Sequence, residues 1–287
     1  MAHLRIGGVP EHFNYPWHVA QEHQLLEKGI SFTWCDFPGG TGAMCRALHE
    51  NEIDLALMLT EGAVADIIHN DQTRIVGTYV ESPLTWGIHV KAESQFTKVA
   101  ELAGQRFAIS RYQSGSHLMA VVHARQQAWN PNALRFEVVG NFEGARRALR
   151  EGKADAFMWE KFTTKPTVDR GEWRRIGECP TPWPCFVIVG RKEPLPAQQS
   201  TIETLLRNVQ GALTYLSKPE RIRYIAAYYN LEVEDVAIWY DQTQWNCTTT
   251  LSRRAIHQVQ EELLSVGVIP RKQSDEMLVS NFTHWKT

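Results

Sequence analysis

Residues 46–54, RALHENEID, and residues 147–155, RALREGKAD, are two versions of one sequence pattern. Five of the nine positions are identical, and each identical pair is separated by 101 residues. Arg5 and Arg106 are separated by the same 101 residues. Because one offset relates all these positions, the chain is expected to contain two related halves.

The residues around this pattern predict the same order of strands and helices in both halves. Met44, Ala47 and Leu48 have the i, i+3, i+4 spacing of an amphipathic helix, and short apolar runs are typical of buried parallel strands. In the first half we expect strands at 4–9, 30–37 and 53–59, and helices at 16–28 and around 44–48. In the second half we expect strands at 105–109, 134–139 and 154–159, and helices at 114–129 and 142–150. This order predicts two doubly wound α/β lobes.

The chain is expected to pass between the lobes twice. A strand at 80–90 runs out of lobe one and a strand at 184–190 returns to it, so that two crossover strands form a hinge. Lobe one then comprises residues 1–86 and 189–287, and lobe two comprises residues 87–188. Helices at 201–216, 219–229, 233–240 and 252–266 form a C-terminal tail, which we expect to pack against lobe one and the hinge.

The composition excludes several classes of protein. The 287 residues include 43% hydrophobic residues, enough to bury a sizeable core. Thirty Lys and Arg against 32 Asp and Glu leave a formal net charge of −2, so no nucleic-acid partner is expected. No segment approaches the roughly 18 apolar residues of a transmembrane helix, and none is expected.

Cysteines and the first residues bear on the compartment. The five cysteines show no metal-ligand spacing, so we expect buried thiols and no metal site. Cys179 and Cys185 flank a proline-rich turn and could instead pair in an oxidising compartment. The opening residues MAHLRI enter a strand at once, without a basic and then apolar leader. We expect a cytoplasmic location, or a periplasmic one if a leader has been removed.

A ligand site is expected where loops leave the carboxyl ends of the strands, because ligands of open α/β sheets bind there. The segments at these positions are 10–17, 39–42, 60–62, 110–117, 141–144 and 159–160, which would form one concave site between the lobes. The side chains that we expect to contact a ligand are His12, Asn14, Thr41, Thr60, Glu61, Arg111, Ser114, Ser116, Trp159 and Glu160.

The stretch from Ser110 to His117 is the strongest of these segments. Three serines and a glycine open a helix, where free backbone N–H groups and hydroxyls favour an anion. Arg111 could add a bidentate contact to a carboxylate, sulfonate or phosphate. The alternative is a plain helix cap by Ser114 or Ser116 with a solvated Arg111. Residues 39–42, GGTG, resemble such a site but lack the spacing and lysine of a P-loop.

The other candidate residues each have a structural alternative. Trp159 could stack on a planar ligand or pack in the core, and Glu160 could accept from an N–H group or be exposed. The aromatic loop from His12 to Trp17 could serve as a lid or merely pack against the next helix.

Catalytic motifs are absent from the sequence. It contains no GxSxG elbow, no HExxH motif and no DxDxDG calcium loop, and we expect no cofactor. Cys35 and His12 close neighbouring strands, so a Cys–His nucleophile pair is conceivable, but neither has a visible orienting partner.

Several motifs occur in an order that resembles type II periplasmic solute-binding proteins, in particular the nitrate, sulfonate, taurine and thiamine-precursor group of ABC transporter components. They are LRIGGV at 4–9, GGTG at 39–42, IDLA at 53–56, LAGQRFA at 102–108, SGSH at 114–117 and ALREGKADA at 148–156. The resemblance implies a small ligand held between two lobes, with contacts from Thr41, Ser114, Ser116, Trp159 and Glu160. It also implies an ABC permease as a partner.

We therefore expect a binding protein for a small anionic or planar heterocyclic solute. A cytoplasmic lyase or hydrolase using His12, Cys35 or Glu160 is the alternative, because the resemblance extends to enzymes on the same fold. These enzymes include menaquinone-pathway lyases, a sulfinate desulfinase and the yeast pyrimidine synthase, whose cysteine-rich run is absent here. A ligand-sensing regulatory module is a third possibility, although no DNA-binding helix pair is visible.

Overall fold

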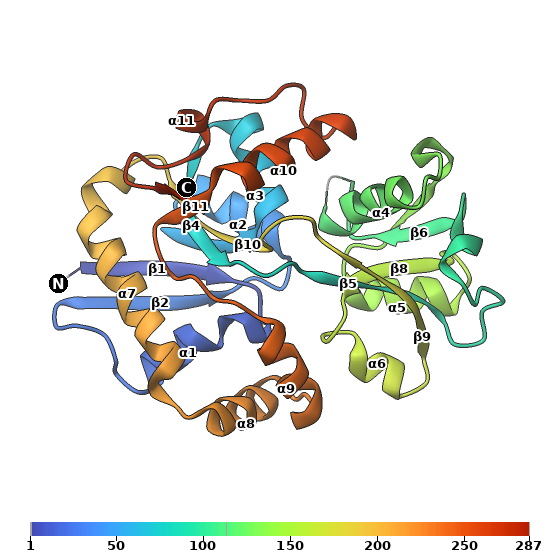
Figure 1. Ribbon diagram of the computed structural model, residues 1–287, viewed down its shortest axis with the longest axis horizontal. Coiled ribbons are helices and arrows are strands. Elements are labelled where there is room, and N and C mark those ends of the chain that lie inside the picture. Colours follow the sequence, from blue (N-terminus) through green and yellow to red (C-terminus); the bar gives the residue numbers. More distant parts are fainter. Residues whose placement is uncertain (1, 113, 287) are drawn as a thin grey trace. The chain divides into compact units, whose positions relative to one another are not determined.

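Two five-stranded sheets with the same strand plan organise the molecule (Figure 1). A computed structural model describes residues 2–112 and 114–286. The chain divides into unit 1, residues 1–82 with 183–287, and unit 2, residues 83–182. In both units helices alternate with parallel strands, and this confirms the predicted pair of doubly wound α/β lobes.

Unit 1 contains the first four strands and a fifth that comes from much later in the chain. Its elements are β1 (Ala2–Gly8), the 3-10 turn His12–Asn14, α1 (Tyr15–Glu22), β2 (Ile30–Asp36), α2 (Thr41–His49), β3 (Leu55–Leu59), α3 (Thr60–Asn70), β4 (Thr73–Val80) and β10 (Phe186–Arg191). The strand order is β2-β1-β3-β10-β4, with β10 antiparallel to both of its neighbours.

Unit 2 repeats this plan in a continuous stretch of chain. Its elements are β5 (Thr85–Lys91), the 3-10 turn Val99–Leu102, β6 (Arg106–Ile109), α4 (Gly115–Gln126), the 3-10 turn Pro131–Ala133, β7 (Arg135–Val138), α5 (Phe142–Arg150), β8 (Ala156–Glu160), α6 (Lys165–Asp169) and β9 (Trp173–Pro180). The strand order is β7-β6-β8-β5-β9, with β5 antiparallel to both of its neighbours.

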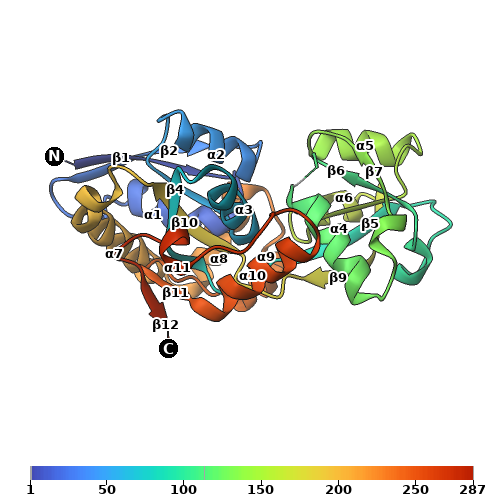
Figure 2. The ribbon, with the colours of Figure 1, turned by 90° about the horizontal axis from the view of Figure 1, so that it is seen from above.

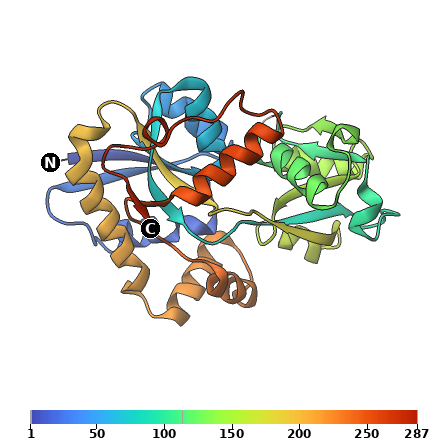
Figure 3. The same cartoon turned by 45° about the horizontal axis from the view of Figure 1, so that its top comes forward.

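The C-terminal tail completes unit 1. It comprises the 3-10 turn Leu195–Gln198, α7 (Gln199–Tyr215), α8 (Lys218–Tyr229), α9 (Val233–Gln242), β11 (Thr250–Ser252), α10 (Arg253–Ser265), α11 (Asp275–Leu278) and β12 (His284–Lys286). The predicted apolar face of α7 is buried, including Leu205, Val209 and Ala212, and α7 packs on α1 (Figure 2). On another side of the sheet α10 packs on α3 (Figure 3).

The sequence repeat corresponds to a repeated hydrogen-bond arrangement. Asp54 Oδ2 accepts the backbone N–H of Arg5 at 2.8 Å, and Asp155 Oδ2 accepts that of Arg106 at 3.0 Å. In both units the N–H of the aspartate donates to the carbonyl of the arginine at 2.8 Å. Each aspartate thus joins the start of the third strand of its half to the first strand.

Two expected elements need correction. The helix predicted at 16–28 ends at Glu22, because Gln24 adopts a left-handed φ of 54° and the N–H of Leu25 bonds back to the Ala20 carbonyl. The strand predicted at 80–90 is in fact the end of β4 and most of β5, which belong to different sheets. Pro83 lies between them and has no N–H to continue a ladder.

Two segments of unit 1 escaped the sequence analysis, α3 and most of β4. Every residue of β4 is buried, because the tail covers it. A Cβ on Gly77 would lie 2.1 Å from the Thr248 carbonyl oxygen, so only glycine allows this approach. Nearby, Thr283 Oγ1 donates to the carbonyls of Ile75 and Val76. No helix in the described part of the chain is long and apolar enough to cross a membrane.

Asp54 is expected to contribute more to stability than its repeat partner Asp155. Asp54 also accepts from the guanidinium groups of Arg5 and Arg191, both at 3.0 Å, and its side chain is 10% exposed. Asp155 pairs with Arg106 at 3.5 Å and is 22% exposed. We expect Asp54→Ala to lower the free energy of unfolding in urea by about 2–4 kcal/mol and Asp155→Ala by about 1 kcal/mol. Equal losses would contradict this ranking.

Low pH is expected to remove the stabilisation that the Asp54 carboxylate provides. Burial acts to raise the pKa of Asp54, but the hydrogen bonds from Arg5 and Arg191 outweigh it and hold that pKa below its ordinary value of 3.8. This stabilisation is present above the unfolded-state pKa and is lost as the pH falls through the lower folded-state pKa.

Candidate functional site

The predicted site residues of unit 1 lie where its parallel strands end, but most are buried. His12, Asn14, Thr60 and Glu61 are each at most 2% exposed, and Thr41 is half-buried. Asn14 Nδ2 donates to the Val9 carbonyl at 2.7 Å and so stabilises the turn after β1.

The loop from His12 to Trp17 does not form the lid considered from the sequence. The His12 ring meets Trp239 edge-on at 4.2 Å between centroids and stacks on Phe13 at 4.9 Å. The carbonyl of Phe13 accepts from Tyr79 and Trp245, at 2.7 and 2.8 Å. The tail therefore covers this loop, and burial lowers the pKa of His12 to about 3.

The amino ends of α2 and α3 meet at the edge of unit 1 where its parallel strands end. Thr41 begins α2, and a Cβ on Gly62 in α3 would lie 2.6 Å from Thr41 Cγ2. The preceding residue, Glu61, accepts from Trp183 Nε1 at 2.9 Å through Oε2. Thr60 Oγ1 donates to the Pro184 carbonyl at 2.5 Å. Helix ends in contact concentrate backbone N–H groups at one place, as an anion or a polar ligand requires.

The predicted serine cluster forms the corresponding edge of unit 2. Ser116 Oγ lies 3.0 Å from Ser114 Oγ and 3.3 Å from Ser110 Oγ, and it accepts the Ser110 N–H at 3.0 Å. Ser114 caps α4 by accepting from the His117 N–H at 3.4 Å. The capping alternative is thus present in the structure, and ligand contact by these hydroxyls stays a prediction. Arg111 is exposed on the same turn, whereas Gln113 lies outside the described residues.

The side chains of Trp159 and Glu160 make their contacts within unit 2. Trp159 stacks on Phe157 at 5.4 Å and packs against the core cluster of Phe157 and Trp173, as the structural alternative supposed. Glu160 is buried rather than exposed, and Oε2 accepts the N–H groups of Phe162 and Thr163 at 3.0 and 2.6 Å. Burial raises the pKa of Glu160 despite these bonds.

Thiol chemistry at this edge has little support from electrostatics. Cys35 is half-buried, and burial raises the pKa of its thiol, the opposite of what an activated nucleophile needs. None of the five cysteines forms a disulfide, including Cys179 and Cys185, which could have paired. Among residues 2–112 and 114–286 no three His, Cys, Asp or Glu side chains gather as a metal site would require.

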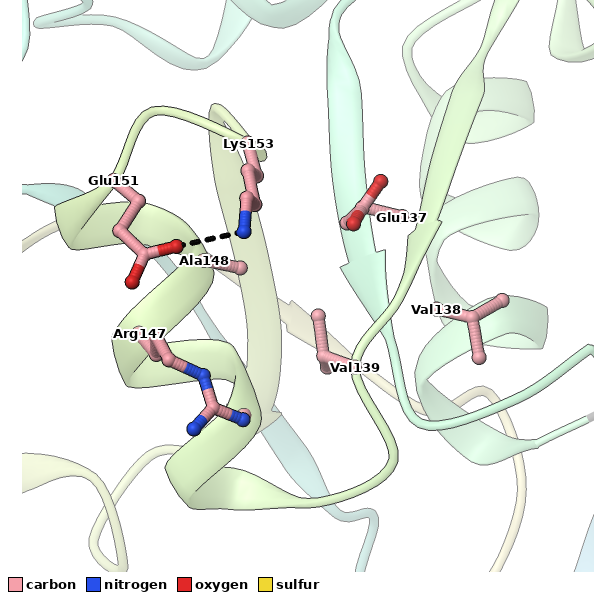
Figure 4. A pocket seen from close by; sticks show the side chains of 8 residues that line it. Glu137, Val138, Val139, Arg147, Ala148, Glu151 and Lys153 are labelled. Atoms are coloured by element: carbon pink, nitrogen blue, oxygen red, sulfur yellow. Dashed lines mark ion pairs between the residues drawn. The ribbon is translucent and has the colours of Figure 1, made fainter.

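A pocket of about 170 Å³ lies elsewhere in unit 2, between β7 and α5. Figure 4 shows Glu137 on the strand facing Arg147 and Lys153 across it. Lys153 pairs with Glu151 at 2.8 Å, so charges of both signs line an open groove. None of the side chains predicted to bind a ligand lines this pocket.

Charge divides unequally between the units. Residues 83–182 carry 15 Lys or Arg and 10 Asp or Glu, a net charge of +5. The rest of the chain carries 15 and 22, a net charge of −7. An anion would therefore be attracted to unit 2, which also holds the serine cluster.

Comparisons with known proteins agree with this architecture. The CA3427 gene product of Candida albicans, described as defining a new family with the generic periplasmic binding protein fold, is 28% identical with a TM-score of 0.86, over 96% of this chain and 93% of that one. The aliphatic sulphonate binding protein SsuA of Escherichia coli is 20% identical with a TM-score of 0.75, over 95% of both chains. This chain has the periplasmic-binding-protein fold.

A further solved structure and a family model also match the chain. The alkanesulfonate-binding protein SsuA of Xanthomonas axonopodis pv. citri, solved with bound MOPS, is 19% identical with a TM-score of 0.78, over 100% of this chain and 99% of that one. Residues 86–179, most of unit 2, match the family described as Ca3427-like PBP. No curated protein matches the chain.

One residue that contacts the candidate site residues of unit 1 was not identified from the sequence. Trp183 is 2% exposed and joins Glu61 from 122 residues away. It sits in the proline-rich segment TPWPC at 181–185, and a tryptophan between two prolines on a chain crossover is the only local signal.

The serine cluster is expected to stabilise unit 2 without any ligand. In Ser116→Ala the half-buried Ser110 N–H loses its acceptor, which should lower the free energy of unfolding by about 1–2 kcal/mol in urea. The exposed Ser200→Ala on α7 is the control and should change it by less than about 0.5 kcal/mol. A Ser116→Ala protein as stable as its parent would show that these bonds contribute nothing.

Alkylation tests the thiol alternative. Cys35 should be the first thiol of the native protein to react, and more slowly than free cysteine at pH 7.5, because its pKa is raised. Cys45, Cys179, Cys185 and Cys247 are buried and should react only after denaturation. A native Cys35 that reacts faster than free cysteine would return nucleophilic catalysis to consideration.

Proposed function

We propose that this chain is a solute-binding protein for a small anionic or planar heterocyclic solute of the sulfonate, nitrate or thiamine-precursor type. The observation that carries the proposal is the fold shared with sulfonate-binding proteins, together with helix amino ends and hydroxyls at the strand ends of each unit. In unit 1 the proposed contact is Thr41, at the amino ends of α2 and α3, and in unit 2 the proposed contacts are Arg111, Ser114 and Ser116.

The electrostatics favour an anion as the first choice. Unit 2 carries a net +5, Arg111 is exposed on the turn that leads into the serine cluster, and α4 begins there with its positive dipole end. We further propose that an ABC permease recognises the solute-bound form. The fold shared with the sulfonate-binding proteins named above supports this proposed partner.

Titration calorimetry with and without Arg111 tests the proposal. Methanesulfonate, taurine, acetate and a pyrimidine are the probes, and at least one should bind to the parent protein. Arg111→Ala should weaken binding of a sulfonate about 10- to 100-fold, the effect of losing one charge-assisted hydrogen-bonded contact.

The matched control is Arg147→Ala, an exposed arginine of α5 that lines the pocket of Figure 4. It should leave sulfonate affinity unchanged. If Arg147→Ala abolishes binding and Arg111→Ala does not, the solute site lies in the β7–α5 groove. If none of the four probes binds the parent protein, the proposed ligand class is wrong.

A further inference from the structure

The amino end of α3 holds the segment on which the chain returns to unit 1. Thr60 donates twice to this segment, from Oγ1 to the Pro184 carbonyl at 2.5 Å and from its N–H to the Cys185 carbonyl at 3.1 Å. The Cys185 N–H donates to the Ser82 carbonyl at 3.2 Å, on the segment where the chain leaves the unit. Trp183 Nε1 donates to Glu61. The first turn of α3 therefore clamps residues 183–185.

Glu61 is the unusual member of this clamp. It is 2% exposed, Oε2 accepts from Trp183, and Oε1 is buried with no hydrogen-bond partner among the residues that the structure describes. The sequence repeat places Phe162 at the equivalent position of unit 2. The buried glutamate of unit 2, Glu160, differs because two N–H groups satisfy it. The fold itself thus does not require a carboxyl at position 61.

No described residue brings an opposite charge to Glu61. Burial raises its pKa to about 7, against smaller opposing effects of its own N–H and of Trp183. The cysteines on these elements, Cys45 on α2 and Cys185 in the return segment, are both buried. His49 on α2 and Asp66 on α3 pair with each other at 3.0 Å, further along the two helices.

We propose that Glu61 is a positioning residue of the solute site, whose neutral carboxyl keeps the return segment 183–185 clamped on α3 and whose ionisation loosens it. The inference rests on the proposed function in one respect, that the first turns of α2 and α3 belong to the solute site. Since Thr41 contacts Gly62, a movement of the clamp reaches both helix ends. Solute affinity would then depend on pH.

The direction follows from the two protonation states. With the clamp closed the carboxyl has a pKa of about 7, and once the clamp is open and solvated it returns to 4.5. The closed form is thus most stable relative to the open form below pH 4.5. Its stability falls as the pH rises to 7, and above pH 7 it no longer depends on pH. Across this range the opening equilibrium should increase at most about 300-fold, which is the ratio set by the two pKa values.

Hydrogen exchange of the ligand-free protein tests the clamp directly. The reporters are the N–H groups of Thr60 and Cys185, read as protection factors so that the intrinsic pH dependence of exchange cancels. In the parent protein both should fall about 40-fold from pH 5 to pH 7. In Glu61→Gln, which keeps an acceptor for Trp183 and cannot ionise, they should change less than about twofold.

Two variants complete the design. Trp183→Phe removes the N–H donor but keeps the aromatic ring, and should lower protection at pH 5. Glu160→Gln, the buried glutamate of unit 2, should leave the pH dependence at Thr60 and Cys185 unchanged. Protection that is independent of pH in the parent protein, or that depends on pH equally in Glu61→Gln, overturns the proposal. Because no solute is present, this result is independent of whether the calorimetric probes bind.

Discussion

The carboxylate of Asp54 connects three strands of unit 1. Asp54 lies directly before β3, and its carboxylate accepts hydrogen bonds from the N–H and guanidinium of Arg5 on β1. It also accepts from the guanidinium of Arg191 at the end of β10. Arg191 and Asp54 are 137 residues apart in the sequence, so one side chain links distant strands. Asp155 makes the same link between β6 and β8, but has no third partner among the residues that the structure describes. In unit 2 the strand in the place of β10 is β5, and Lys91 at its end pairs with Glu93 at 3.6 Å instead.

The return of β10 has a consequence for the candidate site. Strand β10 lies between β3 and β4, so the segment before it must pass the carboxyl end of β3, where α3 begins. Thr60 and Glu61 meet that segment there and use their polar groups on it. The polar groups of these two expected site residues therefore form hydrogen bonds within the fold. The serines of unit 2 are similar, since they bond to one another and to the first turn of α4.

Local sequence pattern was sufficient for much of the fold. The helix at 142–150 was predicted with its observed limits, and the strands of the two βαβαβ halves were placed within a few residues, because burial on one or both faces imposes a period on the sequence. The helix after β1 was overextended because Leu25 and Leu26 continue the apolar pattern beyond a left-handed residue. Most of β4 was missed although Ile75, Val76 and Tyr79 belong to the kind of apolar run that is typical of a buried strand. The approach of the distant tail to Gly77 could not be deduced from the sequence.

For the candidate site, too, some features could be deduced from the sequence and others only from the tertiary structure. From the sequence alone, two α/β halves related by 101 residues, and polar or glycine-rich turns at their strand ends, could be deduced, because hydrogen-bonded elements repeat at short range. Which of those polar groups are exposed, and which are consumed by the fold, was decided only by tertiary contacts. Trp183 meets Glu61 across 122 residues of sequence, and Trp239 of the C-terminal tail packs edge-on against His12. Burial and the loss of water around a carboxyl or an imidazole depend on what packs there, and no local stretch of sequence contains that information.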